Sequence, residues 1–263
     1  MRRQRRRRVP RALKLTHLTS KRARCFSEAG VGRGIQRAID EGVCTLEKIF
    51  VTTKLCPSNY NERGVDRALE TLGLDYIDLM LLHQPAGDYM GGYAALEKAV
   101  GDGKLRSIAL SNFPEKLIKE VIDACGIAPA FVQVEAHPYY PQTALKAFLK
   151  PYGTAVMAWF PLGGRGHTQE HLGNGTITAI AEAHGVSAAQ VIIRWHIQDG
   201  HIAIPCSKNI QHIKDNVDIF DFTITDDEIS KIAKLDRNKA YYKASKVALL
   251  GYLAFAPDFD KQP

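Results

Sequence analysis

The sequence YIDLMLLHQP at residues 76–85 decides the fold class. Its centre is a continuous apolar run without alternation, which is typical of a strand buried on both faces in a parallel sheet. The run ends at His83, followed by Gln84 and Pro85, so the imidazole lies where strand becomes loop. In a parallel α/β barrel, that C-terminal strand edge carries the chemistry. His83 is therefore the first candidate functional residue.

Strand and helix patterns alternate along the chain from residue 28 onward. Strands are predicted at residues 49–55, 76–83, 105–110, 130–134, 154–160 and 201–205. Helices are predicted at residues 31–41, 62–72, 93–100, 114–124, 143–149, 176–184, 187–198, 209–217 and 226–235. This alternation predicts parallel pairing through right-handed crossovers. A closed (β/α)8 TIM barrel needs eight strands, so the prediction is a single α/β barrel domain over residues 25–263 that is incomplete at its N-terminus, with six β/α units.

The formal net charge of +7 is concentrated at the start of the chain. Residues 1–24 contain eleven Lys or Arg and no Asp or Glu, which leaves 24 basic and 28 acidic residues, a net charge of −4, for the remainder. We expect this low-complexity leader to be disordered. It could bind phosphates of nucleic acid or lipid, act as a transit peptide, or result from translation in the wrong frame or from the wrong start. We favour the last of these.

Cysteine and apolar patterns predict a cytoplasmic protein without a membrane segment. The five cysteines form no CxxC pair and are odd in number, which favours reduced thiols over a disulfide framework. The late apolar run at residues 247–256 is too short to cross a bilayer, and no apolar segment of a secretory signal follows the arginines. We expect a monomer.

Seven short motifs follow one another at the predicted strand ends. They are VTTKL at 51–55, LGLDYIDL at 72–79, LLHQP at 81–85, LSNF at 110–113, VQVEAHPYY at 132–140, WFPLG at 159–163 and IPCSKN at 204–209. With these motifs, residues 28–238 resemble the aldo-keto reductases, in particular bacterial members. The resemblance implies a (β/α)8 barrel that binds NADP(H) across its C-terminal mouth and reduces aldehydes or ketones to alcohols.

The resemblance also implies roles for individual residues. Lys54 matches the lysine that lowers the pKa of the proton donor, and His83 matches the histidine that orients the substrate carbonyl. The alternatives are a solvated strand-end lysine and a hydrogen-bonded core histidine. The remaining matches are Ser111, Asn112 and Gln133 for the nicotinamide carboxamide, Trp159 for stacking on the nicotinamide ring, and Leu162 and Gly163 near the pyrophosphate. His167 and His171 have an i, i+4 spacing but no third ligand, so we expect no metal site.

The adenosine end matches less well. The positions where many members of the family have a lysine and an arginine hold Cys206 and His212. Lys208 is close enough to replace the first charge, and Ser207, Asp215 and Asn216 match the expected polar contacts. These residues favour NADP(H) and do not exclude NAD(H).

The resemblance ends abruptly upstream of residue 28. The family's catalytic aspartate and tyrosine align with Ser20 and Cys25, which can replace neither a carboxylate nor a phenol that reaches the substrate oxygen. We therefore predict weak or no turnover. The chain is then either a slow enzyme or a remnant that binds cofactor without catalysis. A binder of nucleic acid or acidic membrane through the leader ranks lower, because the body has no second basic stripe. Tyr241, Tyr242, Tyr252 and Phe255 either line the substrate pocket or pack beneath it.

Overall fold

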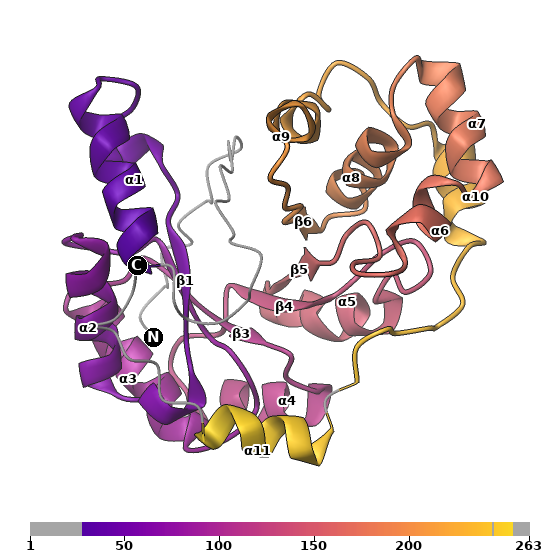
Figure 1. The fold of residues 1–263 in the computed structure, drawn as a ribbon. Helices are drawn as coiled ribbons and strands as arrows, with labels where there is room; N and C mark the ends of the chain where they lie inside the picture. Colours follow the sequence, from indigo (N-terminus) through magenta and orange to yellow (C-terminus); the bar gives the residue numbers. More distant parts are fainter. Residues whose placement is uncertain (1–27, 244, 255–263) are drawn as a thin grey trace.

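The computed structural model describes residues 28–243 and 245–254, and within them six strands form one parallel sheet. The strands follow chain order: β1 (Thr52–Leu55), β2 (Leu79–Leu82), β3 (Ile108–Ser111), β4 (Phe131–Glu135), β5 (Ala155–Trp159) and β6 (Ile202–Ala203). The sheet curls into an open half-barrel with helices around it (Figure 1), which confirms the predicted barrel of six β/α units. The basic leader, Ser20, Cys25 and Phe255 lie outside the described residues.

The apolar run in β2 is explained by burial on both faces of the sheet. Met80 and Leu82 pack into the main core between the sheet and its outer helices. Leu79 and Leu81 point the other way, into an interior cluster with residues such as Ala109, Phe131 and Met157. All four β2 side chains have zero exposure. Because successive side chains of a strand alternate between faces, only burial on both sides produces an unbroken apolar run.

The predicted helices are all present, with small differences at their ends. They are α1 (Glu28–Asp40), α2 (Glu62–Leu72), α3 (Tyr89–Gly101), α4 (Glu115–Ala124), α5 (Thr143–Leu149), α7 (Gly175–His184), α8 (Ala188–Gln198), α9 (Ile210–Val217) and α10 (Asp226–Ala233). Short 3-10 turns occur at η1 (Leu46–Lys48), η2 (Pro57–Asn59) and η3 (Lys150–Tyr152). Gly73 ends α2 at φ 67, in the left-handed conformation that favours glycine. The helix predicted from Pro114 begins one residue later, and Pro114 is its N-cap.

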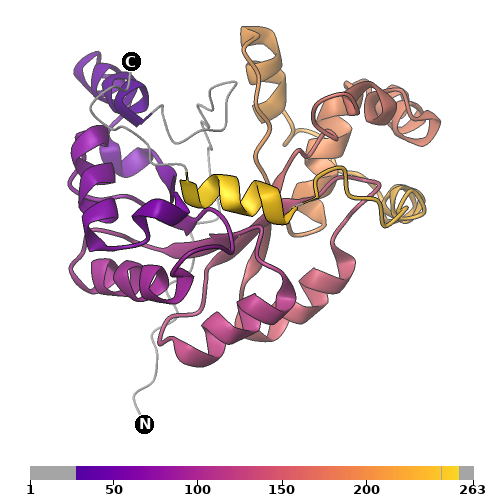
Figure 2. The same cartoon turned by 60° about the horizontal axis from the view of Figure 1, so that its bottom comes forward.

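Two helices were not predicted, α6 (Thr168–Leu172) and α11 (Lys246–Ala254). Helix α11 lies beside the C-terminal end of β1 (Figure 1) and passes in front of the strands in Figure 2, and it contacts η2, which follows β1. Within the described ranges, no single helix is long and apolar enough to cross a membrane, and α7 and α8 meet that test only as a pair bent by 93°. Cys44, Cys125 and Cys206 are free thiols.

Candidate active site

The C-terminal ends of β1 to β5 bring five of the predicted residues to one rim of the sheet. Lys54 lies near the end of β1, where it pairs in register with Leu81. His83 follows β2, and its backbone N–H donates to the carbonyl oxygen of Leu55 at 3.1 Å. Asn112 follows β3, while Gln133 and Trp159 belong to β4 and β5. Parallel pairing in chain order places these five positions side by side.

Asn112 connects four strand ends. Its φ of 63 is left-handed, a conformation that asparagine tolerates better than most residues. Its backbone N–H donates to the Gln133 carbonyl at 2.9 Å, and its Nδ2 donates to the His83 carbonyl at 3.4 Å. Its Oδ1 accepts from Trp159 Nε1 at 3.0 Å. Asn112 therefore fixes the orientation of the indole ring relative to His83.

A hydroxyl and two amides form a buried polar group beside this connection. Ser111 and Gln133 are register partners, and each has 1% of its surface exposed. Ser111 Oγ accepts from Asn112 Nδ2 at 3.3 Å, and Gln133 Nε2 lies 2.8 Å from the sulfur of Met157. A thioether is a weak acceptor, so Gln133 can exchange this contact for a better one. The three residues could together bind a carboxamide.

Burial shifts the ionisation of both basic groups at the rim. Burial lowers the pKa of Lys54 to about 8. Burial, with the Lys54 charge nearby, lowers the pKa of His83 to about 3. At pH 7 the lysine is therefore mostly cationic and the histidine is neutral. His83 Nδ1 is buried without a hydrogen-bond partner among the described residues, and the Tyr252 ring lies edge-on to the imidazole at 5.4 Å between centroids.

Packing accounts for the glycines that follow Trp159. Gly163 has a φ of 84, and a Cβ there would lie 2.2 Å from the His171 ring. Gly164 has a φ of 69, and a Cβ there would meet the Phe160 ring at 2.2 Å. Leu162 packs against the core of α7 and α8. The contacts of Gly163 thus involve His171 and give no independent sign of a phosphate.

The residues expected at the adenosine end gather around α9, separate from the rim. Ser207 Oγ lies 3.4 Å from His212 Nδ1, and Asp215 Oδ1 accepts from Gln211 Nε2 at 2.8 Å. Lys208 is exposed just before the helix begins, and Asn216 lies in its last turn. These contacts are local ones within and next to a single helix.

Two tyrosines make contacts near the rim that no local sequence motif indicated. The buried hydroxyl of Tyr60 donates to the Gln84 carbonyl at 2.7 Å and accepts the Gln84 N–H at 2.8 Å, which holds the loop after His83. Tyr242, which the sequence left open between lining and packing, lies against Trp159 with 5.4 Å between ring centroids. Tyr60 lies 24 residues from Gln84, so no pattern within one element indicates the contact.

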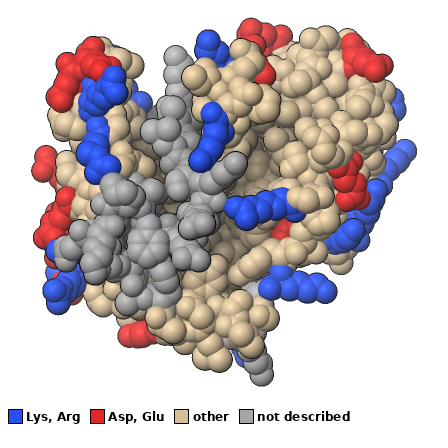
Figure 3. All heavy atoms as spheres, viewed as in Figure 1, with Lys and Arg blue, Asp and Glu red and all other residues tan. Residues whose placement is uncertain are grey.

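Charge on the exposed surface is dispersed. On the face in Figure 3, Lys and Arg side chains stand singly or in small groups among uncharged atoms, and no continuous basic stripe is visible among the described residues. The part of the chain that the structure describes also contains no group of three or more His, Cys, Asp or Glu side chains able to hold a metal ion. His167 and His171 instead contact Tyr241.

Comparisons with known proteins agree with this geometry. Residues 23–237 match the family model described as the aldo/keto reductase family. Morphine 6-dehydrogenase of Pseudomonas putida is 43% identical over 226 residues, which cover 80% of this chain and 75% of the relative. A Bombyx mori aldo-keto reductase in complex with NADP has a TM-score of 0.76 and 34% identity, over 82% of this chain and 77% of that one. An aldo/keto reductase from Brucella melitensis has a TM-score of 0.72 and 38% identity, over 80% of each chain. The chain belongs to the aldo/keto reductase family.

Proposed function

We propose that this chain is an NADP(H)-dependent oxidoreductase that reduces aldehydes or ketones to alcohols, with slow turnover. The observation that carries the proposal is the convergence of Lys54, His83, Asn112 and Trp159 on one rim of the half-barrel. The solved Bombyx mori relatives, in complex with NADP and with NADPH, support the choice of cofactor. Morphine 6-dehydrogenase and the D-xylose reductase of Scheffersomyces stipitis support oxidoreduction at a carbonyl or alcohol.

The residues present fit a nicotinamide cofactor. His83 Nδ1, which has no hydrogen-bond partner among the described residues, and the Gln133 amide, which contacts only a thioether, leave hydrogen-bonding capacity at the rim. Ser111, Asn112 and Gln133 would hold the carboxamide, and Trp159 would stack on the ring. Leu162 and Gly163 would lie near the pyrophosphate. Around α9 the adenosine would meet Ser207, Lys208, His212, Asp215 and Asn216. The Lys208 ammonium favours NADP(H) over NAD(H).

The chain's own groups would polarise the carbonyl. Bound NADPH supplies the hydride. Neutral His83 can donate one hydrogen bond to the carbonyl oxygen, and the nearby Lys54 cation stabilises the negative charge that develops there. The alignment of Cys25 with the family's tyrosine leaves water as the proton source. Loss of a general acid costs roughly 10²–10⁴ in rate, so we expect slow reduction.

Fluorescence titration and a turnover assay test the proposal. We expect saturable quenching by NADPH, and slow loss of NADPH absorbance with a generic aldehyde. His83→Ala should abolish the residual turnover and leave cofactor binding in place, because the imidazole faces the carbonyl. Binding without turnover in the wild type would favour the cofactor-binding remnant. Absence of binding would contradict both, and turnover as fast as that of a complete relative would contradict the alignment of residues 20–28.

The cellular location, the oligomeric state and the substrate class stay predictions from the sequence. We expect a cytoplasmic monomer that acts on a small-molecule carbonyl compound. Binding of nucleic acid or acidic membrane through the leader would require a strong salt dependence that deletion of residues 1–24 abolishes.

A further inference from the structure

A buried carboxylate holds the segment that returns from α10 to the mouth of the half-barrel. We call residues 236–243 the strap. The backbone N–H of Tyr241 donates to Glu135 Oε1 at 2.7 Å, and that of Tyr242 donates to Glu135 Oε2 at 2.8 Å. Glu135 is the last residue of β4 and has 4% of its surface exposed. The two oxygens of one carboxylate thus accept two consecutive amides across 106 and 107 residues of sequence.

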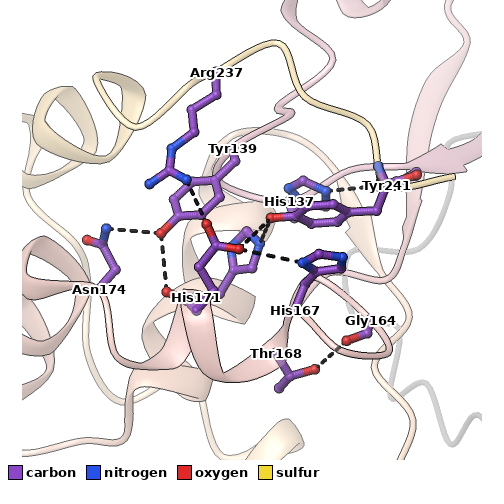
Figure 4. Close-up of polar contacts among 11 residues, drawn as sticks. His137, Tyr139, Gly164, His167, Thr168, His171, Asn174, Arg237 and Tyr241 are labelled. Carbon is purple, nitrogen blue, oxygen red and sulfur yellow. Dashed lines mark hydrogen bonds and ion pairs between the residues drawn. The ribbon is translucent and has the colours of Figure 1, made fainter.

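Three histidines form a slot for the Tyr241 ring (Figure 4). His167 stacks on it at 3.6 Å with an interplanar angle of 3°, and His137 lies on it at 4.6 Å and 24°. His171 Nε2 lies 3.1 Å from the Tyr241 hydroxyl. His137 Nε2 lies 3.0 Å from Glu135 Oε1, and because a carboxylate only accepts, the imidazole donates. The slot and the carboxylate are therefore one connected unit.

Further contacts fix the start of the strap to the same unit. The N–H groups of Arg237 and Lys239 donate to the Tyr139 carbonyl at 3.0 and 3.3 Å. The Arg237 guanidinium lies 3.7 Å above the Tyr139 ring and 2.6 Å from Glu170 Oε1. Burial acts to raise the pKa of Glu135, but the hydrogen bonds from His137 and the two amides outweigh it and hold that pKa below its usual value. The carboxylate is therefore charged at neutral pH, which strengthens both amide contacts.

The strap determines what stands beside the reactive rim. Glu135 is the register partner of Trp159, and the Tyr242 ring lies against Trp159 at 5.4 Å and 78°. The Tyr242 hydroxyl is buried near the side chains of Gln84 and Tyr252, and His83 Nδ1 is buried without a hydrogen-bond partner among the described residues. Beyond the strap, α11 brings Tyr252 to 5.4 Å from the His83 ring. A loose strap would therefore move one wall of the carbonyl site.

We infer that Glu135 and Tyr241 are positioning residues, which latch the strap so that Tyr242 stands beside Trp159 as a wall of the carbonyl site. Because this role depends on the proposed function, its test needs one readout that does not involve turnover. Hydrogen exchange of the Tyr241 and Tyr242 amides provides it, since both amides donate to the carboxylate in question.

The decisive variant is Glu135→Gln, which replaces one acceptor oxygen by an NH2 group facing an amide. We expect exchange at residues 241 and 242 to become about tenfold faster, the size expected for loss of a charge-assisted hydrogen bond. We also expect the KM for the aldehyde to rise about tenfold, with kcat and the NADPH Kd changing less than about twofold, because the strap touches the carbonyl side. Tyr241→Phe, which keeps both ring stacks, should stay close to wild type, whereas Tyr241→Ala should resemble Glu135→Gln.

Asp78→Asn is the matched control. Asp78 is a carboxylate with 3% exposure that accepts the Val51 N–H at 2.9 Å and pairs with Arg106 at 2.9 Å, at the other end of β2. Its replacement should lower stability without changing exchange at the strap or the KM. Unchanged strap exchange in Glu135→Gln, or an equal rise of KM in Asp78→Asn, would overturn the latch. A wild-type chain without turnover would contradict the proposed function, and the exchange comparison would still decide the latch.

Discussion

The rim of β1 to β5 and the edge formed by β6 and α9 are built in different ways. Neighbouring strands from β1 to β5 share three to five register pairs, whereas β5 and β6 share two. Helix α9 has no buried residue, and its Ile210 and Val217 expose 72% and 53% of their surfaces. The fold therefore holds the rim, the proposed nicotinamide side, in place in advance, while the proposed adenosine side depends on a few local contacts. Four measurements test this contrast.

The largest expected effect is on stability. Leu81→Ala removes a side chain with zero exposure from the interior of the half-barrel and should lower the free energy of unfolding by about 2–5 kcal/mol. Ile213→Ala on α9, where 38% of the side chain is exposed, should cost less than about 1 kcal/mol. Urea denaturation of both variants measures the difference. Equal losses would show that α9 is packed as firmly as β2.

The second test concerns the connection at Asn112. Asn112→Gly and Asn112→Ala both remove the amide that orients Trp159, so both should weaken NADPH binding. The left-handed backbone at φ 63 is unfavourable for alanine, so the alanine variant should be less stable than the glycine variant by about 1–2 kcal/mol. Urea denaturation compares the two variants. A more stable alanine variant would mean that the backbone at residue 112 relaxes out of this conformation.

The third test uses the buried charge of Lys54, whose pKa is lowered to about 8 from 10.5. Between those two values the unfolded chain binds more protons than the folded chain, so this residue's contribution makes stability rise with pH. Below about pH 8 the lysine is cationic in both states, and burial of its charge costs a constant amount. Lys54→Met should therefore stabilise the protein at pH 7, and its advantage over wild type should shrink between pH 8 and 10.5. A difference in urea midpoint that does not change with pH would contradict the shift.

The same contrast explains what the sequence could predict. Strands such as β2 and β3 were predicted because burial on both faces leaves an apolar run within one local stretch. The run at residues 76–83 nevertheless forms a strand only at Leu79–Leu82, since Asp78 uses its side chain to accept the Val51 N–H. Helix α11 was not predicted because its apolar residues do not recur at the 3.6-residue spacing of an amphipathic helix. The contact of Glu135 with Tyr241 joins residues 106 apart, so no spacing within a motif could indicate it.

The smallest expected effect lies at the exposed edge. Lys208→Ala should weaken NADPH binding by about twofold to fivefold and leave NADH binding unchanged, because only NADPH carries the 2′-phosphate that the ammonium would meet. The effect is small because an exposed ion pair contributes about 0–1 kcal/mol, and added salt should reduce it further. Lys214→Ala, also exposed on α9, is the control and should change neither affinity. A loss of NADPH affinity of tenfold or more for Lys208→Ala would mean that cofactor binding buries the lysine. The edge of β6 and α9 would then become ordered around the phosphate on binding, whereas the rim is already ordered before binding.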